Sequence, residues 1–128
     1  MKEKILIVED NPQNMRLMAM TLRARDYTLL KATDGEEALD VATREQPDLI
    51  LMDIQLPGLS GLEVTRRLKQ MPEFSQIPII ALTAYAMKGD WEECIEAGCD
   101  AYLSKPVNTR ELPRMITEML LRWKQDST

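Results

Sequence analysis

Five short apolar runs, each followed by a stretch with helical spacing, constrain the fold of this chain more than any other feature. The runs cover residues 5–8, 28–30, 49–52, 77–82 and 101–103. Four of them lack the polar alternation of a strand with one wet face, which is typical of parallel strands covered on both sides. Strands and helices in alternation favour one doubly wound α/β domain with right-handed crossovers.

Helix-start and helix-stop residues divide the stretches between these runs. Three starts carry capping residues: Asn11 before Pro12, Asp34 before Glu37, and Ser60 before Glu63. A fourth helical segment covers residues 87–97 and stops at Gly98. In the fifth, Pro113 removes an N–H near the end of the first turn, so we expect a late start or a bend. That helix ends close to the C-terminus, so we expect residues 1–128 to form one domain without an output domain.

The chain contains no histidine, and this absence excludes several kinds of chemistry. It rules out a Ser-His-Asp or Cys-His catalytic pair, histidine-ligated zinc or haem, and a phosphohistidine formed on this chain. The formal charge is −5, and the basic stripe that DNA- and RNA-binding proteins usually carry is missing. We therefore expect no direct contact with nucleic acid.

Cysteine spacing and hydropathy indicate a cytoplasmic chain. Cys94 and Cys99 match neither a zinc knuckle nor a redox C-x-x-C motif, so we expect two reduced thiols. No signal peptide precedes the first apolar run, and no run approaches the roughly 18 apolar residues of a membrane span. These features predict a cytoplasmic protein without membrane contact.

Chemically active side chains follow four of the five predicted strands. In an open α/β sheet the ligand lies beyond the carboxyl ends of the strands. Glu9 and Asp10 follow the first strand, and Asp53 follows the third. Thr83 follows the fourth strand, and Lys105 follows the fifth. If the first and third strands are neighbours, three carboxylates converge on one pocket.

Three converging carboxylates repel one another, and burial adds to the cost. Lys105 offsets only part of this charge, so a hard divalent cation, Mg²⁺ by default, suits the remainder. Asp53 stands alone at its strand end, whereas Glu9 and Asp10 are paired, so Asp53 is best placed to attack phosphorus and form an acyl phosphate. Lys105 and the Thr83 hydroxyl would then contact the phosphoryl oxygens.

Each of these residues also has a structural alternative. Asp10 could cap the helix that begins at Pro12, and Thr83 could cap the loop that follows it. Their joint occurrence at four strand ends favours the functional interpretation for the set as a whole.

Four segments, in this order and spacing, resemble a known family. They cover residues 7–11, residues 48–53 with 56–58 and Gly61, residues 81–84, and residues 98–106. Over roughly residues 3–122 the chain is similar to the receiver domain of bacterial two-component response regulators. The resemblance implies a flavodoxin-like (βα)5 fold, with a five-stranded parallel sheet of order 2-1-3-4-5 and helices on both faces.

The resemblance also assigns roles to the residues at the strand ends. It implies that Asp53 is the phosphoacceptor and that Lys105 contacts the phosphoryl group. It further implies that Mg²⁺, or Mn²⁺, is held by Glu9, Asp10, Asp53 and the backbone carbonyl oxygen of Gln55.

A conformational switch and its partners are implied as well. Thr83 resembles the switch hydroxyl and Tyr102 the switch aromatic, and the Lys105–Pro106 bond is expected to be cis. Phosphorylation would shift the surface of the fourth helix, fifth strand and fifth helix between two states, which a downstream protein reads. The donor would be a phosphohistidine on a histidine kinase or a histidine phosphotransfer protein. Beyond its own phosphorylation and dephosphorylation, the chain is not expected to be an enzyme.

Other side chains are candidates for tuning and docking. Gln55 and Tyr85 flank the expected site, and we expect them to tune the lifetime of the acyl phosphate. Met20 falls off the apolar stripe of the first helix and could belong to a docking surface for the donor. Trp91 and Trp123 are candidates on the output surface, with core packing as the alternative for Trp123 and for Met20.

The alternatives differ in context and in class. The chain could be a stand-alone receiver of the DivK-like type, which we expect, or a receiver from a hybrid kinase or a DNA-binding regulator. A Mg²⁺-dependent aspartyl phosphohydrolase would need a second Asp two residues after the nucleophile, where this chain has Gln55. A flavin-binding flavodoxin would need a Ser/Thr-rich phosphate loop, where this chain has Glu9, Asp10 and Asn11.

Overall fold

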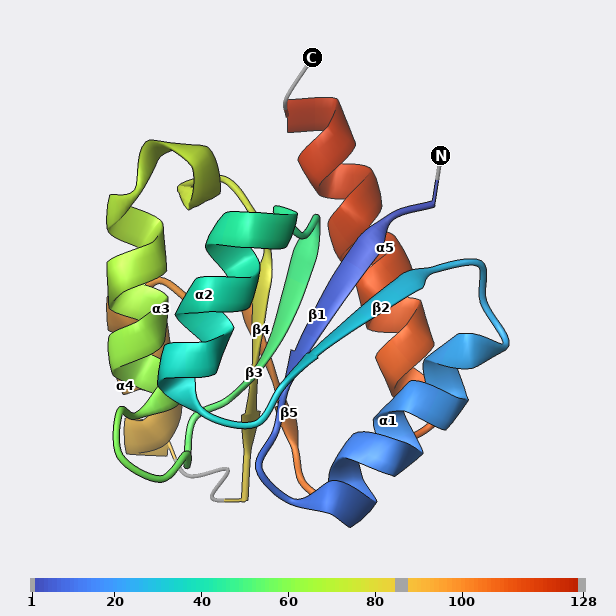
Figure 1. The fold of residues 1–128 in the computed structure, drawn as a ribbon, viewed down its shortest axis with the longest axis horizontal. Coiled ribbons are helices and arrows are strands. Elements are labelled where there is room, and N and C mark those ends of the chain that lie inside the picture. Colours follow the sequence, from blue (N-terminus) through green and yellow to red (C-terminus); the bar gives the residue numbers. More distant parts are fainter. Residues whose placement is uncertain (1, 85–87, 127–128) are drawn as a thin grey trace.

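A computed structural model of the chain shows an open parallel sheet with helices on both faces (Figure 1). The structure describes residues 2–84 and 88–126, and for residues 88–90 and 123–126 the backbone alone. The strands are β1 (Lys4–Val8), β2 (Thr28–Ala32), β3 (Leu49–Asp53), β4 (Ile79–Thr83) and β5 (Ala101–Ser104). The helices are α1 (Pro12–Arg23), α2 (Gly35–Glu45), α3 (Gly61–Gln70), the 3-10 turn η1 (Pro72–Phe74), α4 (Lys88–Ala97) and α5 (Glu111–Asp126).

The strand order is β2-β1-β3-β4-β5, and every neighbouring pair is parallel. This is the predicted order 2-1-3-4-5, which is therefore confirmed. The direction of winding reverses between β1 and β3, so the connections that follow these two strands run to opposite faces of the sheet. Such a reversal leaves a crevice at the carboxyl ends of the two strands.

Alternate residues of the central strands pack into two separate cores. Along β1, Leu6 and Val8 face the core under α2, α3 and α4, whereas Ile5 and Ile7 face the core under α1 and α5 (Figure 1). All four side chains are fully buried. Burial on both faces explains why these strands are continuous apolar runs in the sequence.

Side-chain caps start the first three helices, as predicted. Asn11 Oδ1 accepts hydrogen bonds from two backbone N–H groups in the first turn of α1. Asp34 and Ser60 cap α2 and α3 in the same way. Each cap satisfies a donor that a helix start leaves unpaired. Because Asn11 is the cap of α1, Asp10 does not fill that role, and the structural alternative for it is wrong.

The strands extend beyond the predicted apolar runs, and in two of them the extension matters. Asp53 is the last residue of β3, and Thr83 is the last residue of β4. The sheet therefore holds the backbone of both residues in place. β4 begins at Ile79, later than predicted, because Pro78 has no N–H to donate to a neighbouring strand.

Helix α5 begins ahead of Pro113. Asn108 Oδ1 accepts hydrogen bonds from the N–H groups of Arg110 at 2.8 Å and Glu111 at 3.0 Å. Of the two expectations, the late start is wrong, because this cap starts the helical turn before the proline is reached, whereas the bend at Pro113 stays a prediction. Among the described residues, no helix, α5 included, has the length and apolar character needed to span a membrane.

Candidate functional site

The carboxyl edge of the sheet brings the predicted side chains together. Asp53 and Thr83 end β3 and β4, and Glu9 and Lys105 directly follow β1 and β5. The parallel register keeps the ends of β3, β4 and β5 at one level. The ends of four strands therefore place the four predicted site residues at one edge of the sheet, as expected from the sequence.

Glu9, Asp10 and Asp53 form an acidic cluster in which one carboxylate oxygen of each residue lies within 4.8 Å of the other two. Glu9 and Asp53 are each 1% exposed, whereas Asp10 is exposed. Water therefore screens the repulsion between the two buried carboxylates poorly. The cluster forms because β1 and β3 are neighbours in the sheet.

The Lys105 ammonium group bridges the two buried carboxylates. Its Nζ donates a hydrogen bond to Asp53 Oδ2 at 2.8 Å and lies 3.0 Å from Glu9 Oε1. The Lys105 side chain is 16% exposed, so these contacts are stronger than those of an ion pair in open solvent. One ammonium group against three carboxylates still leaves the site with an excess of negative charge.

Two backbone N–H groups orient the buried carboxylates. The N–H of Asn11 donates to Glu9 Oε2 at 3.1 Å, and the N–H of Gln55 donates to Asp53 Oδ1 at 2.9 Å. In both cases the carboxylate accepts from the N–H two residues further on, as in an Asx turn. These two donors were not predicted from the sequence. The available signal was an acidic residue placed two positions ahead of a loop N–H.

Burial and neighbouring charges shift the pKa values of Glu9 and Lys105. Burial raises the pKa of Glu9 above its usual 4.5, and Asp53 adds to the rise, although the Asn11 N–H and Lys105 act against it. Burial by itself would lower the pKa of Lys105, but its contacts with Asp53 and Glu9 outweigh burial and raise it above 10.5. Lys105 is therefore positively charged at neutral pH, and Glu9 ionises less readily in the folded chain than a free glutamate does.

The donor set fits a hard divalent cation. Glu9 Oε1 is buried and, within the described part of the chain, receives no hydrogen bond of good geometry, although Lys105 Nζ lies 3.0 Å from it. The exposed Asp10 carboxylate stands beside it and is not used as a helix cap. Several oxygen donors with excess negative charge are what Mg²⁺ and Mn²⁺ prefer. The residues present therefore fit the predicted metal.

Of the predicted switch residues, Thr83 ends the strand beside that of Asp53, and Tyr102 lies further back from this edge, in register with Ala81. Thr83 is buried at the end of β4, and Tyr102 is half-buried on the neighbouring strand β5. The Tyr102 ring lies against Trp91 of α4, a contact that the sequence did not reveal. The Lys105–Pro106 bond is cis, as expected. Two predicted positions lie outside the described residues: Tyr85 and the side chain of Trp123.

Cys94 and Cys99 are thiols that take part in no disulfide, as the spacing predicted, and both are buried. Burial raises the pKa of Cys99 to about 12. A thiol with such a pKa forms almost no thiolate at neutral pH, and the thiolate is the reactive form. Both cysteines are therefore packing residues of the core under α4.

Sheet order and site chemistry together define a signalling receiver and not a flavin protein, since an acidic cluster would repel the phosphate of a flavin. Family comparison agrees with this class. The chain belongs to the response regulator receiver domain family, whose model matches residues 5–117.

The curated relatives indicate which kind of response regulator it resembles. The chain is 51% identical over 116 residues to the polar-differentiation response regulator DivK of Brucella anthropi, covering 91% of this chain and 92% of that protein. DivK of Brucella ovis and DivK of Brucella abortus match with the same identity and coverage. The chain is therefore a DivK-like response regulator of two-component signalling.

Solved structures show the same fold. A putative response regulator from Chloroflexus aurantiacus superimposes with a TM-score of 0.91 at 31% identity, covering 94% of this chain and 99% of that one. The receiver domain of sensor histidine kinase PA1611 from Pseudomonas aeruginosa PAO1 has a TM-score of 0.84 at 41% identity, covering 96% and 98%. That receiver carries a magnesium ion coordinated in its active site cleft.

Proposed function

We propose that Asp53 accepts a phosphoryl group from a phosphohistidine of a partner, and that this modification switches the surface formed by α4, β5 and α5. The observation that carries the proposal is the placement of Asp53. Its buried carboxylate contacts Lys105 Nζ at 2.8 Å and lies beside the acidic pair Glu9 and Asp10. Membership of the receiver family supports the same chemistry.

The transfer exchanges one bond to phosphorus for another. An oxygen of the Asp53 carboxylate attacks the phosphorus atom, the N–P bond of the donor breaks, and the released imidazole takes up a proton. Lys105 Nζ supplies positive charge beside the attacked phosphoryl group. The Gln55 N–H keeps the carboxylate oriented. Mg²⁺, which neutralises phosphoryl oxygens when bound, would be held by Glu9, Asp10, Asp53 and the backbone carbonyl of Gln55.

Thr83 and Tyr102 carry the change in Asp53 to the surface. Thr83 ends β4, next to the strand that ends in Asp53. A phosphoryl group on Asp53 offers new acceptor oxygens for the Thr83 hydroxyl, and a shift of Thr83 alters the space open to Tyr102 on β5. Tyr102 lines a surface cavity of about 390 Å³ together with residues of β5 and the start of α5. Movement of its ring therefore changes what a downstream protein contacts.

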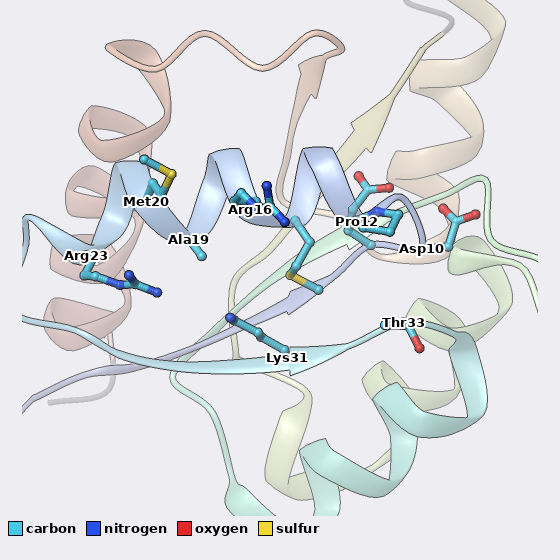
Figure 2. Close-up of a pocket in the computed structure, with 10 residues that line it drawn as sticks. Asp10, Pro12, Arg16, Ala19, Met20, Arg23, Lys31 and Thr33 are labelled. Atoms are coloured by element: carbon cyan, nitrogen blue, oxygen red, sulfur yellow. The ribbon is translucent and has the colours of Figure 1, made fainter.

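A donor protein would dock beside α1. Leu17 and Met20 are 41% and 61% exposed on this helix, in agreement with the predicted surface role of Met20. A groove of about 500 Å³ runs between α1 and β2, and Figure 2 shows Lys31 of β2 across from the helix. Arg16 and Arg23 line the same groove, whose other end is formed by the acidic pair. Apolar and cationic side chains next to the phosphorylation site suit a partner that presents its phosphohistidine there.

The cellular setting follows from the same features. Residues 1–128 act as one receiver domain, with no catalysis beyond its own phosphorylation and dephosphorylation. Two cysteines that form no disulfide suit a reducing cytoplasm. The net charge of −5 gives no attraction to nucleic acid, so the output is a protein contact.

Labelling with a small phosphodonor tests the assignment of Asp53. Incubation with acetyl phosphate and Mg²⁺ should add one phosphoryl group, measured as an intact-mass increase that is lost at alkaline pH. Asp53→Asn should remove this label, because an amide oxygen is a poor nucleophile. Asp40→Asn is the matched control, since Asp40 is an exposed carboxylate of α2 paired with Arg44. Equal labelling of Asp53→Asn and the wild-type chain would contradict the assignment.

A further inference from the structure

Trp91 of α4 lies directly against the proposed switch residue Tyr102. The two ring centroids are 4.6 Å apart, and the ring planes are tilted by 36°. Both side chains are half-buried, and both pack on the core under α2, α3 and α4. Offset and tilted aromatic pairs at this separation attract each other beyond the simple effect of burial. Trp91 therefore stabilises the position in which Tyr102 is observed.

The contact joins the switch residue to the outer face of α4. Ile95 lies one helical turn beyond Trp91, and it is 52% exposed. Tyr102 also reaches the surface cavity between β5 and the start of α5. Trp91 and Tyr102 thus form a continuous aromatic contact between a partly apolar helix face and the strand next to Thr83. Displacement of one ring therefore alters the packing of the other ring.

We propose that Trp91 is a positioning residue that restrains Tyr102 and sets how readily this receiver switches. The inference rests on the proposed function of Asp53. Tyr102 lines the surface cavity between β5 and the start of α5 while it contacts Trp91, so we take this arrangement as the unswitched state. An inward turn of Tyr102 after phosphorylation would take its ring away from the indole, so the Trp91 contact stabilises the unswitched state. Any contact present in only one of two states shifts their ratio toward that state. Trp91 consequently opposes switching, and its fluorescence reports the position of Tyr102.

Fluorescence gives a direct readout, because the chain has only two tryptophans. In the Trp123→Phe background all tryptophan emission comes from Trp91. Treatment with acetyl phosphate and Mg²⁺ should change this emission along the same time course as the phosphoryl label measured by mass. In Trp123→Phe combined with Tyr102→Leu, the emission change should be largely lost while the label still forms. A label without any change in Trp91 emission would overturn the inference.

Labelling rates give a second readout that packing alone would not move. Trp91→Ala should speed phosphorylation by acetyl phosphate by about two- to tenfold, as expected when an aromatic contact that restrains the unswitched state is lost. Trp91→Phe keeps a ring beside Tyr102 and should return the rate most of the way to that of the wild-type chain. A rate that is unchanged or slower in Trp91→Ala, at a melting temperature that shows a folded protein, would also overturn the inference.

The two proposals fail in distinguishable ways. If Asp53→Asn is labelled as well as the wild-type chain, the assignment of the phosphoacceptor fails, whatever Trp91 does. If the label requires Asp53 but neither the Trp91 emission nor the Trp91→Ala rate responds, only the role of Trp91 fails.

Discussion

At Glu9, a cost in folding stability accompanies a carboxylate oxygen that is placed to bind a cation. Its carboxylate is buried beside Asp53, which makes the charged form costly in the folded chain. Within the described residues, Oε1 of the same carboxylate receives no hydrogen bond of good geometry and stays available as a metal ligand, although Lys105 Nζ lies 3.0 Å away. The chain therefore gives up stability at the position that we propose as a cation ligand, a common trade at functional sites.

Replacing Glu9 by glutamine should stabilise the chain when no metal is present. The pKa of Glu9 is raised above 4.5 by burial, so its contribution to stability is complete below pH 4.5 and is lost as the pH rises through the raised value. In EDTA at neutral pH, Glu9→Gln should therefore melt at a higher temperature than the wild-type chain. Melting curves across a pH series measure the difference.

The pH series also provides the control for this prediction. The advantage of Glu9→Gln should shrink toward pH 4.5, where Glu9 of the wild-type chain binds its proton. Glu45→Gln, a change at a partly exposed carboxylate that ends α2 beside Arg44, is the matched control and should show no comparable trend. A Glu9→Gln chain that becomes less stable than the wild type as the pH rises would contradict the burial argument.

Gly61 shows how a whole element depends on one missing side chain. A Cβ at this first residue of α3 would overlap the backbone carbonyl oxygen of Asp53 and crowd the backbone of Ile54. The Gly61 N–H also donates to the Ile54 carbonyl oxygen at 3.3 Å. The start of α3 therefore sits directly on the end of β3, and the helix supports the backbone of the proposed phosphoacceptor.

Gly61→Ala should destabilise the chain by at least about 1–3 kcal/mol, because the new methyl group has no room unless α3 and the end of β3 separate. The movement of Asp53 should also slow labelling by acetyl phosphate. Chemical denaturation and intact-mass kinetics measure the two effects.

Gly58→Ala separates crowding from backbone strain. Gly58 has a φ of 72°, but a Cβ added there would have no neighbour within 4 Å, so its replacement costs only the left-handed backbone penalty of roughly 1–2 kcal/mol. Phosphorylation of that variant should stay close to the wild-type rate. A Gly61→Ala chain that labels as fast as Gly58→Ala would show that α3 does not position Asp53.

At the scale of the whole molecule, the carboxyl ends of four strands meet at one acidic edge of the sheet. Glu9, Asp53, Thr83 and Lys105 come from different strand ends, and none of them can meet another until the sheet is assembled. A metal site built from these residues would exist only in the folded chain, so metal binding would be coupled to folding. The free energy of unfolding should therefore rise when a metal ion binds at this edge.

Mg²⁺ should stabilise the folded chain, and EDTA should remove the effect. A ligand that binds only the folded state at one hundred times its Kd adds roughly 2.7 kcal/mol to the free energy of unfolding. Thermal melts over a Mg²⁺ series measure the increase. Asp10→Asn should reduce it, because the exposed carboxylate of the acidic cluster loses its charge. An Asp10→Asn chain with the same Mg²⁺ response as the wild type would remove Asp10 from the site.

Much of this fold and site could be predicted before the structure was known. Continuous apolar runs are typical of strands covered on both faces, and this pattern predicted the doubly wound sheet. Caps such as Asn11 act locally, so they too are readable from sequence. The start of α5 was harder to predict. Asn108 caps this helix from three residues before its first residue, whereas Pro113 inside the first turn suggested a later start.

The chain by itself determined which groups stand at the strand ends, since that depends only on where each apolar run stops. The tertiary structure alone decided which of these groups contact one another and how deeply they are buried. Assembly of the sheet buries Glu9 beside Asp53, sets Lys105 between them and lays Trp91 on Tyr102. Contacts between residues far apart in sequence, and the desolvation that shifts the pKa of Glu9, arise only when the layers close.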